Sequence, residues 1–118
     1  VWGGIMGCQH GFLLLLDAVL AQCPEKLPLV WGLVSEAPAR RFGLAARKGR
    51  IAPGCDADLV LIERTEPRTI ATDELLYRHK TSPFIGAKIS TRVARSLLRG
   101  EDVGSQSAGG RFISREVV

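Results

Sequence analysis

Residues able to carry acid–base or metal chemistry are few in this chain and stand far apart. His10 and His79 are the only two histidines, and no acidic cluster accompanies either of them. A catalytic zinc ion needs several protein ligands gathered around it, and this spacing does not supply them. We therefore predict that the chain holds no metal ion and no catalytic residue of its own, and we interpret both histidines as hydrogen-bonded structural residues.

The carboxylates, hydroxyls and thiols add no reactive group. Asp56 and Asp58 precede an apolar run, where aspartates ordinarily form turns and caps. No serine has the G-x-S-x-G surroundings of a nucleophile. Cys8, Cys23 and Cys55 are an odd number of cysteines at irregular spacing, which fits neither a disulfide framework nor a metal knuckle. This usage predicts small, buried, reduced thiols and hence a cytoplasmic location. Cys8 is the exception, because its glycine-rich surroundings leave it open to exposure.

A glycine-rich stretch near the N-terminus is the segment whose composition suits binding. Residues 2–10 read WGGIMGCQH, with three glycines within five positions. Glycines leave the backbone N–H and C=O groups open to a ligand. Because the stretch directly precedes a predicted helix, it has the layout of the βα loops that form the active face of a barrel. On composition alone, an ordinary turn remains the alternative.

The elements that must position this stretch are helices in the first part of the chain. Residues 11–22 predict a helix that is apolar nearly all round, as expected of an element buried on several sides. Residues 27–36 predict a second helix. A short third helix is expected to begin at Pro38, after a weak cap at Ala37, and to end at Gly43 in a left-handed conformation.

Strands are predicted in the second part of the chain. The pattern indicates strands at residues 58–63, 69–70, 89–99 and 111–113, a capped helical turn at 72–77 and a flexible segment at 104–110. These strands are too sparse to close a sheet, and the first helix is too apolar for a free surface. Both features predict that further protein surrounds this chain.

Length and charge exclude several classes of protein. The chain has 118 residues and a net charge of +4. A complete (β/α)₈ barrel takes about 250 residues, and no apolar run approaches the roughly 18 residues of a membrane span. The basic residues are interleaved with apolar ones and aromatic residues are few, so we predict no nucleic-acid partner and no membrane. Because the chain begins at Val1, we expect a processed chain or a piece of a longer one.

Four segments in order resemble the cyclic amidohydrolase superfamily. Residues 48–62, KGRIAPGCDADLVLI, are similar to its K-G-x-I-x-x-G-x-D-A-D-L-V signature, and residues 38–44 are similar to the N-P-A-x-x-F-G-L helix, with Ala37 in place of the asparagine. Residues 2–9 resemble the loop after the last barrel strand of the allantoinases, and residues 77–86 resemble their Y-x-H-K-x-S-P-Y-x-G segment. Dihydroorotases and dihydropyrimidinases share only the 38–44 and 48–62 segments.

The resemblance implies an α/β fragment of two domains. Residues 1–46 would be the last loop and helices of a metal-dependent (β/α)₈ barrel, and residues 47–118 the C-terminal strands of a small β-sandwich domain. The parent enzyme would open allantoin to allantoate with a binuclear divalent metal centre of the zinc type and a carboxylated lysine, whose ligands all precede Val1. This chain alone is therefore expected to be inactive.

The resemblance also implies a substrate site and partners. By analogy, Gly3, Gly4, Ile5 and Gln9 would bind the polar edge of a cyclic amide. The expected partners are the missing barrel, the small substrate and further copies of the chain. Two alternatives stay open: a dihydroorotase-like or metal-free, non-catalytic homologue, and a stand-alone interaction module that buries its apolar helices against a partner or a second copy.

Overall fold

The computed structural model describes residues 6–104 and 109–113, which form two compact units. Unit 1 combines the chain up to Pro24 with residues 63–92, and unit 2 combines residues 25–62 with the chain from Val93 onward. Each unit is thus built from two separate stretches of sequence. The domains 1–46 and 47–118 remain a prediction, as does the flexibility of 104–110, most of which lies outside the described residues.

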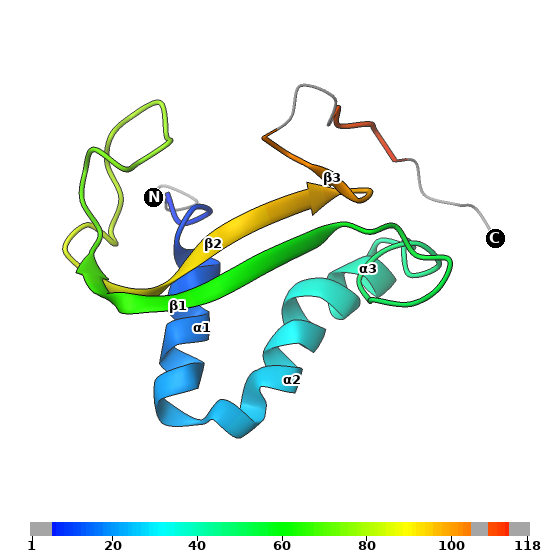
Figure 1. Ribbon diagram of the computed structural model, residues 1–118, viewed down its shortest axis with the longest axis horizontal. Coiled ribbons are helices and arrows are strands. Elements are labelled where there is room, and N and C mark those ends of the chain that lie inside the picture. Colours follow the sequence, from blue (N-terminus) through cyan, green and yellow to red (C-terminus); the bar gives the residue numbers. More distant parts are fainter. Residues whose placement is uncertain (1–5, 105–108, 114–118) are drawn as a thin grey trace, which may run out of the picture. The chain divides into compact units, whose positions relative to one another are not determined.

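Helix α1 spans Gly11–Gln22 and confirms the predicted helix with the same bounds (Figure 1). Leu13 and Leu16, three positions apart, are its buried residues, while Leu15 on the opposite side is exposed. The helix ends where the N–H of Cys23 donates to the carbonyl of Val19, because Pro24 follows and cannot continue it.

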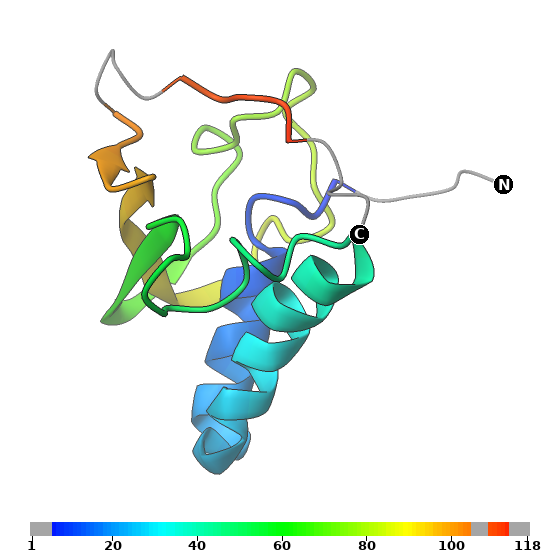
Figure 2. The same cartoon turned by 90° about the vertical axis from the view of Figure 1, so that its right-hand side faces the viewer.

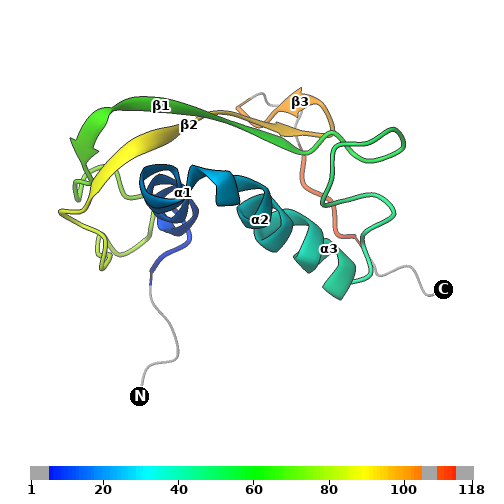
Figure 3. The same cartoon turned by 90° about the horizontal axis from the view of Figure 1, so that it is seen from below.

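The second helical run is longer than predicted. A 3₁₀ turn, η1 (Pro24–Lys26), leads into α2 (Leu27–Trp31), a π-helical segment η2 (Gly32–Glu36) and α3 (Ala37–Arg41) without interruption, as Figure 3 shows for α2 and α3. The predicted break before Pro38 is wrong, since Ala37 has helical φ and ψ of −62° and −45°. The wide π turn comes directly before the proline, whose ring would clash with a carbonyl in a regular helix.

The end of α3 confirms the predicted left-handed glycine. Gly43 has a φ of 70°. Its N–H donates to the carbonyl of Arg40 at 3.1 Å, and the N–H of Leu44 donates to the carbonyl of Ala39 at 2.7 Å. These two bonds are the Schellman pattern, which satisfies the last free carbonyls of a helix.

Strands β1 (Leu59–Thr69), β2 (Lys88–Leu98) and β3 (Glu101–Asp102) form a three-stranded antiparallel sheet in the order β1-β2-β3 (Figures 1 and 2). The two strands predicted at 58–63 and 69–70 are one continuous strand, and the strand predicted at 89–99 is confirmed. Leu97 pairs with Asp102 and Leu98 with Glu101. Arg99 and Gly100 between them both have positive φ, 53° and 86°, the pattern of a two-residue type I′ hairpin.

The remaining predicted elements are turns or coil. Residues 72–75 form a single turn, in which Leu75 N–H donates to the Thr72 carbonyl at 3.4 Å, rather than a helix. Residues 111–113 form no strand within the described part of the chain. In the same part, no helix is both long and apolar enough to cross a lipid bilayer.

The two units differ in how well they bury apolar side chains. Unit 1 has the larger buried set, which comprises Leu13, Leu16, Ile70, Leu75 and Ile89. In unit 1, α1 is joined to β2, because Thr91 Oγ1 donates to the Leu13 carbonyl at 3.3 Å and Ser90 N–H donates to Asp17. In unit 2, only two described hydrophobic residues are buried, Val30 and Ala39, while several apolar side chains on its helices and loops are exposed: Leu29, Leu33, Phe42 and Ile51.

Candidate functional site

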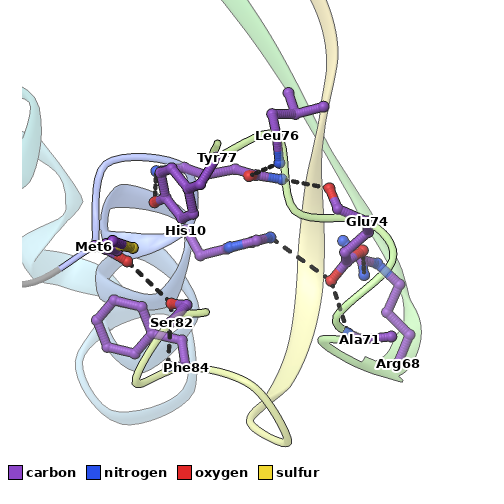
Figure 4. Close-up of polar contacts among 10 residues, drawn as sticks. Met6, His10, Arg68, Ala71, Glu74, Leu76, Tyr77, Ser82 and Phe84 are labelled. Atoms are coloured by element: carbon purple, nitrogen blue, oxygen red, sulfur yellow. Dashed lines mark hydrogen bonds and ion pairs between the residues drawn. The ribbon is translucent and has the colours of Figure 1, made fainter. Parts of the chain in front are cut away.

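The described end of the glycine-rich stretch, residues 6–10, lies against residues 71–84 in unit 1 (Figure 4). The N–H of Gln9 donates to the hydroxyl oxygen of Tyr77 at 2.8 Å, and Ser82 Oγ donates to the carbonyl of Met6 at 3.0 Å. The paired residues are 68 and 76 positions apart in the sequence. The structure therefore joins the two segments whose sequences resemble those of allantoinases, a contact that the sequence did not predict.

The side chain of Gln9 is held at both ends by backbone groups. Its Nε2 donates to the carbonyl of Glu74 at 2.9 Å, and its Oε1 accepts from the N–H of Leu76 at 2.8 Å. The amide thus pairs with the 74–76 backbone as a neighbouring strand would. Gln9 is the one predicted substrate-binding residue that the structure describes, since Gly3, Gly4 and Ile5 lie outside the described residues.

Glu74 links this contact to the end of β1 and to the start of α1. Its Oε2 lies 2.5 Å from Nη1 of Arg68, and its Oε1 accepts from the N–H of Ala71 at 3.1 Å. The same Oε1 lies 3.6 Å from Nε2 of His10 (Figure 4). Strand β1 and helix α1 therefore bring an arginine, a carboxylate and an imidazole together.

His10 is buried at the N-terminal end of α1, with 3% of its surface exposed. Its Nδ1 has no hydrogen-bond partner among the described residues. Nε2 faces the Glu74 carboxylate, whereas Nδ1, on the other side of the ring, meets no such group among the described residues. The interpretation of His10 as a structural residue fits this position, whereas His79 is exposed.

Unit 2 holds a second polar cluster, the charged knot, made of Arg47, Lys48, Asp56 and Asp58. Lys48 Nζ lies 2.7 Å from Asp56 Oδ2 and also hydrogen-bonds Asp58. Arg47 Nη2 lies 3.1 Å from Asp56 Oδ2, and Asp58 Oδ1 accepts from the N–H of Arg99 at 2.9 Å. These residues belong to the 48–62 signature and its flank, so the signature carries its own ion pairs.

The pKa values of the charged knot follow from these contacts. The hydrogen bond from Lys48 lowers the pKa of Asp56. Burial raises the pKa of Asp58, but hydrogen bonds from Lys48 and from the Arg99 N–H outweigh it, and the pKa is lowered overall. Burial lowers the pKa of Lys48, and its bonds to both aspartates reverse this. The two carboxylates stay ionised and paired, as suits a turn and not an acid–base site.

The described residues do not fit a binuclear metal centre. Over residues 6–104 and 109–113, no three His, Cys, Asp or Glu side chains come close enough to hold an ion. The three cysteines are free thiols, as predicted, and Cys8 is exposed in its glycine-rich surroundings. Cys23 and Cys55 are partly exposed, so the prediction of buried thiols is wrong for these two.

The chain is similar to known proteins over most of its length. No family model matches it. An allantoinase of Bacillus licheniformis is 39% identical over an alignment of 118 positions, which covers 95% of this chain and 26% of that protein. An allantoinase of Escherichia coli is 40% identical over 100 residues, 85% of this chain and 22% of that protein.

Solved structures similar to this chain come from related enzymes. Dihydropyrimidinase from Brevibacillus agri superposes with a TM-score of 0.72 at 30% identity, over 78% of this chain and 20% of that one. The chain belongs to the cyclic amidohydrolase superfamily. A second superfamily member, L-hydantoinase from Arthrobacter aurescens, superposes with a TM-score of 0.65 at 25% identity, over 85% of this chain and 23% of its own. This chain thus spans about a quarter of the length of its superfamily relatives.

Sequence reasoning missed four residues of the site, Met6, Glu74, Tyr77 and Ser82. The signal was present, because Tyr77 and Ser82 stand in the segment that resembles allantoinases and their hydroxyls need partners. A pairing across 65 or more positions leaves no trace in local spacing, however. Only the fold shows that this segment and the glycine-rich stretch belong to one site.

Proposed function

We propose that this chain is the C-terminal part of a cyclic amidohydrolase that hydrolyses allantoin to allantoate. The observation that supports the substrate most strongly is the joining of residues 6–10 to residues 74–82, because these are the segments that resemble allantoinases and not the wider superfamily. The two allantoinases are also more similar to the chain, at 39% and 40% identity, than the dihydropyrimidinase and the hydantoinase, at 30% and 25%.

In this proposal, the glycine-rich stretch binds the substrate ring. A hydantoin ring is flat and alternates N–H and C=O groups around its edge. Gly3, Gly4 and Ile5 would meet it with backbone N–H and C=O groups, which glycine leaves accessible. The residues of this chain therefore bind and orient the ring, and they carry no bond-breaking step.

The rest of the enzyme supplies what this chain lacks. The binuclear divalent metal centre and the carboxylated lysine implied by the resemblance belong, in this proposal, to residues outside those described here. The partners of the chain are the remainder of the barrel and further copies of the protein, and its location is the cytoplasm. The exposed apolar side chains of unit 2, Leu29, Leu33, Phe42 and Ile51, support a covering partner.

The test uses the longer protein encoded together with this chain, supplied with divalent metal. We expect it to hydrolyse allantoin and to leave dihydroorotate, a dihydropyrimidine and unsubstituted hydantoin largely unchanged. The 118-residue chain alone should show no hydrolysis. A preference for dihydroorotate would replace the allantoinase proposal with the dihydroorotase-like alternative. Translation that starts immediately before Val1, with no hydrolase activity, would favour the stand-alone module.

A further inference from the structure

The contacts of Gln9 differ from those of a substrate-binding side chain. Its N–H, its Nε2 and its Oε1 each have a partner within residues 74–77. To bind a ring, the amide would have to leave the Glu74 carbonyl and the Leu76 N–H without partners. Such a contact would have to replace two hydrogen bonds that the amide already makes, so it would add little to binding.

We infer that Gln9, Glu74, Tyr77 and Ser82 form a loop clamp, whose role is to position the backbone of the glycine-rich stretch. In this inference, which rests on the proposed function, Gln9 and Tyr77 are positioning residues and do not touch the substrate. Gln9 was predicted to bind the ring itself. The loop clamp replaces that role with an indirect one, in which the amide fixes the chain that carries Gly3 and Gly4.

The glycine-rich stretch needs such a device because its own sequence does not hold it. Ordering the backbone costs conformational entropy at every residue, and most at glycine. Helix α1 anchors the stretch on one side, where the N–H of Gly11 donates to the carbonyl of Gly7 at 2.8 Å. Tyr77 and Ser82 add anchors at Gln9 and at Met6, which is only two residues from Gly4.

Fixing the stretch before the substrate arrives improves binding, because the ordering cost is met during folding. The backbone contacts at Gly3 and Gly4 would be made equally to the substrate and to the transition state. Their loss raises KM and leaves kcat nearly unchanged. A purely structural role would lower the amount of folded protein instead, without changing this ratio.

The deciding variant is Tyr77→Phe, which removes only the hydroxyl that accepts from Gln9. In the longer protein, we expect KM for the cyclic amide to rise about three- to tenfold, the effect of one hydrogen bond, with kcat within about twofold of the wild type. Ser82→Ala should act in the same direction and serves if Tyr77→Phe does not fold. The matched control is Thr65→Val, which removes a hydroxyl that donates to the Glu66 carbonyl on β1, away from the glycine-rich stretch.

A second measurement needs no activity. In the longer protein, amide hydrogen exchange at Gln9 should accelerate in Tyr77→Phe and stay at the wild-type rate in Thr65→Val. Unchanged KM in Tyr77→Phe and Ser82→Ala, in an enzyme that hydrolyses cyclic amides, would overturn the loop clamp alone. A longer protein that hydrolyses no cyclic amide would overturn the proposed function and the loop clamp with it.

Discussion

The loop clamp of unit 1 and the charged knot of unit 2 hold their backbones by opposite means. The loop clamp joins residues 65 to 76 positions apart through neutral hydrogen bonds. The side-chain pairs of the charged knot join residues only 8 to 10 positions apart. The entropy lost on closing a loop grows with its length. The charged knot can therefore form from neighbouring residues alone, whereas the loop clamp can form only after α1, β1 and β2 have packed together.

This difference distinguishes the 48–62 signature from the candidate site formed by residues 6–10 and 71–84. In the 48–62 segment, the lysine and the two aspartates pair with one another, which makes them part of the scaffold. The glycine-rich stretch and the 77–86 segment each look incomplete in the sequence, with polar groups that lack partners nearby. Incomplete segments that complete each other in the fold are therefore the better guide to the proposed binding site.

The largest loss of stability is expected from a substitution at Gly49, next to Lys48 of the charged knot. It tests whether the charged knot depends on close backbone packing as well as on charge. Gly49 has a φ of 89°, and a Cβ there would lie 2.6 Å from Ala39 Cβ and 2.8 Å from the Ser35 carbonyl oxygen. Gly49→Ala combines a left-handed alanine with overpacking, and we expect it to lower the free energy of unfolding by about 2–5 kcal/mol. Urea denaturation measures this loss.

The matched control for that change is Gly54→Ala. Gly54 has nearly the same φ, 86°, but a Cβ there would meet nothing within 4 Å. Its cost should be only that of the left-handed conformation, about 1–2 kcal/mol. Equal losses in the two variants would show that packing against Ala39 contributes nothing.

The next effect concerns His10, the buried imidazole beside the loop clamp. His10→Ala removes a buried side chain and its contact with Glu74, and it should cost about 2 kcal/mol. His10→Gln keeps a donor near the position of Nε2 and removes the unpartnered Nδ1, so its loss should stay within about 1 kcal/mol. Thermal unfolding of both variants checks this, and a larger loss in His10→Gln would mean that Nδ1 has a partner.

A smaller effect is expected from Lys48→Met, which removes the shared cation of the charged knot. The pKa values of Asp56 and Asp58 are lowered below 3.8, so their stabilisation is present above that pH and is lost as the pH falls through the lowered values. The pKa of Lys48 is raised above 10.5, so its contribution is lost as the pH rises past that value. The urea midpoints of wild type and variant should therefore differ at pH 7 and converge below pH 3.8; a constant difference would contradict the ion pairs.

The smallest effect should come from Glu36→Gln. Its partner Arg40 lies four positions on, with Nη2 2.6 Å from Oε1, and both side chains are exposed. An exposed pair of this kind contributes about 0.3–0.5 kcal/mol and weakens in salt. Unfolding at low and at high ionic strength measures it, and a loss as large as that of Lys48→Met would remove the distinction between the charged knot and an ordinary surface pair.

The parts of the fold that could be predicted are those with local causes. Helix α1 and the glycine at the end of α3 follow from residues within a few positions of each other. The long helical run through Ala37 could not be predicted, because a proline ordinarily interrupts a helix. Here the π-helical segment Gly32–Glu36 directly precedes Ala37 and Pro38, and the run continues through both. The pattern predicts a strand that ends at Glu63, whereas β1 continues to Thr69. The residues that follow Glu63 are polar or, at position 67, proline, and such residues suit a strand only at the edge of a sheet, where β1 lies.

The candidate site was predictable only in its parts. The glycine-rich stretch was singled out by composition and the 77–86 segment by resemblance. Their contact depends on a buried core in unit 1, and Leu75 and Ile89, which help to form that core, carry no pattern that links them to Gln9. The role of Gln9 changed for the same reason, because its partners stand 65 to 68 positions away.

Pro67 has a consequence for how copies of this protein meet in concentrated solution. It lies in β1, which pairs with β2 on one side and with no other described strand. An open strand edge is a template on which a second chain can add by backbone pairing, the first step toward fibrils. A proline breaks the row of donors along such an edge. A second chain that pairs with β1 would therefore find no N–H donor at Pro67.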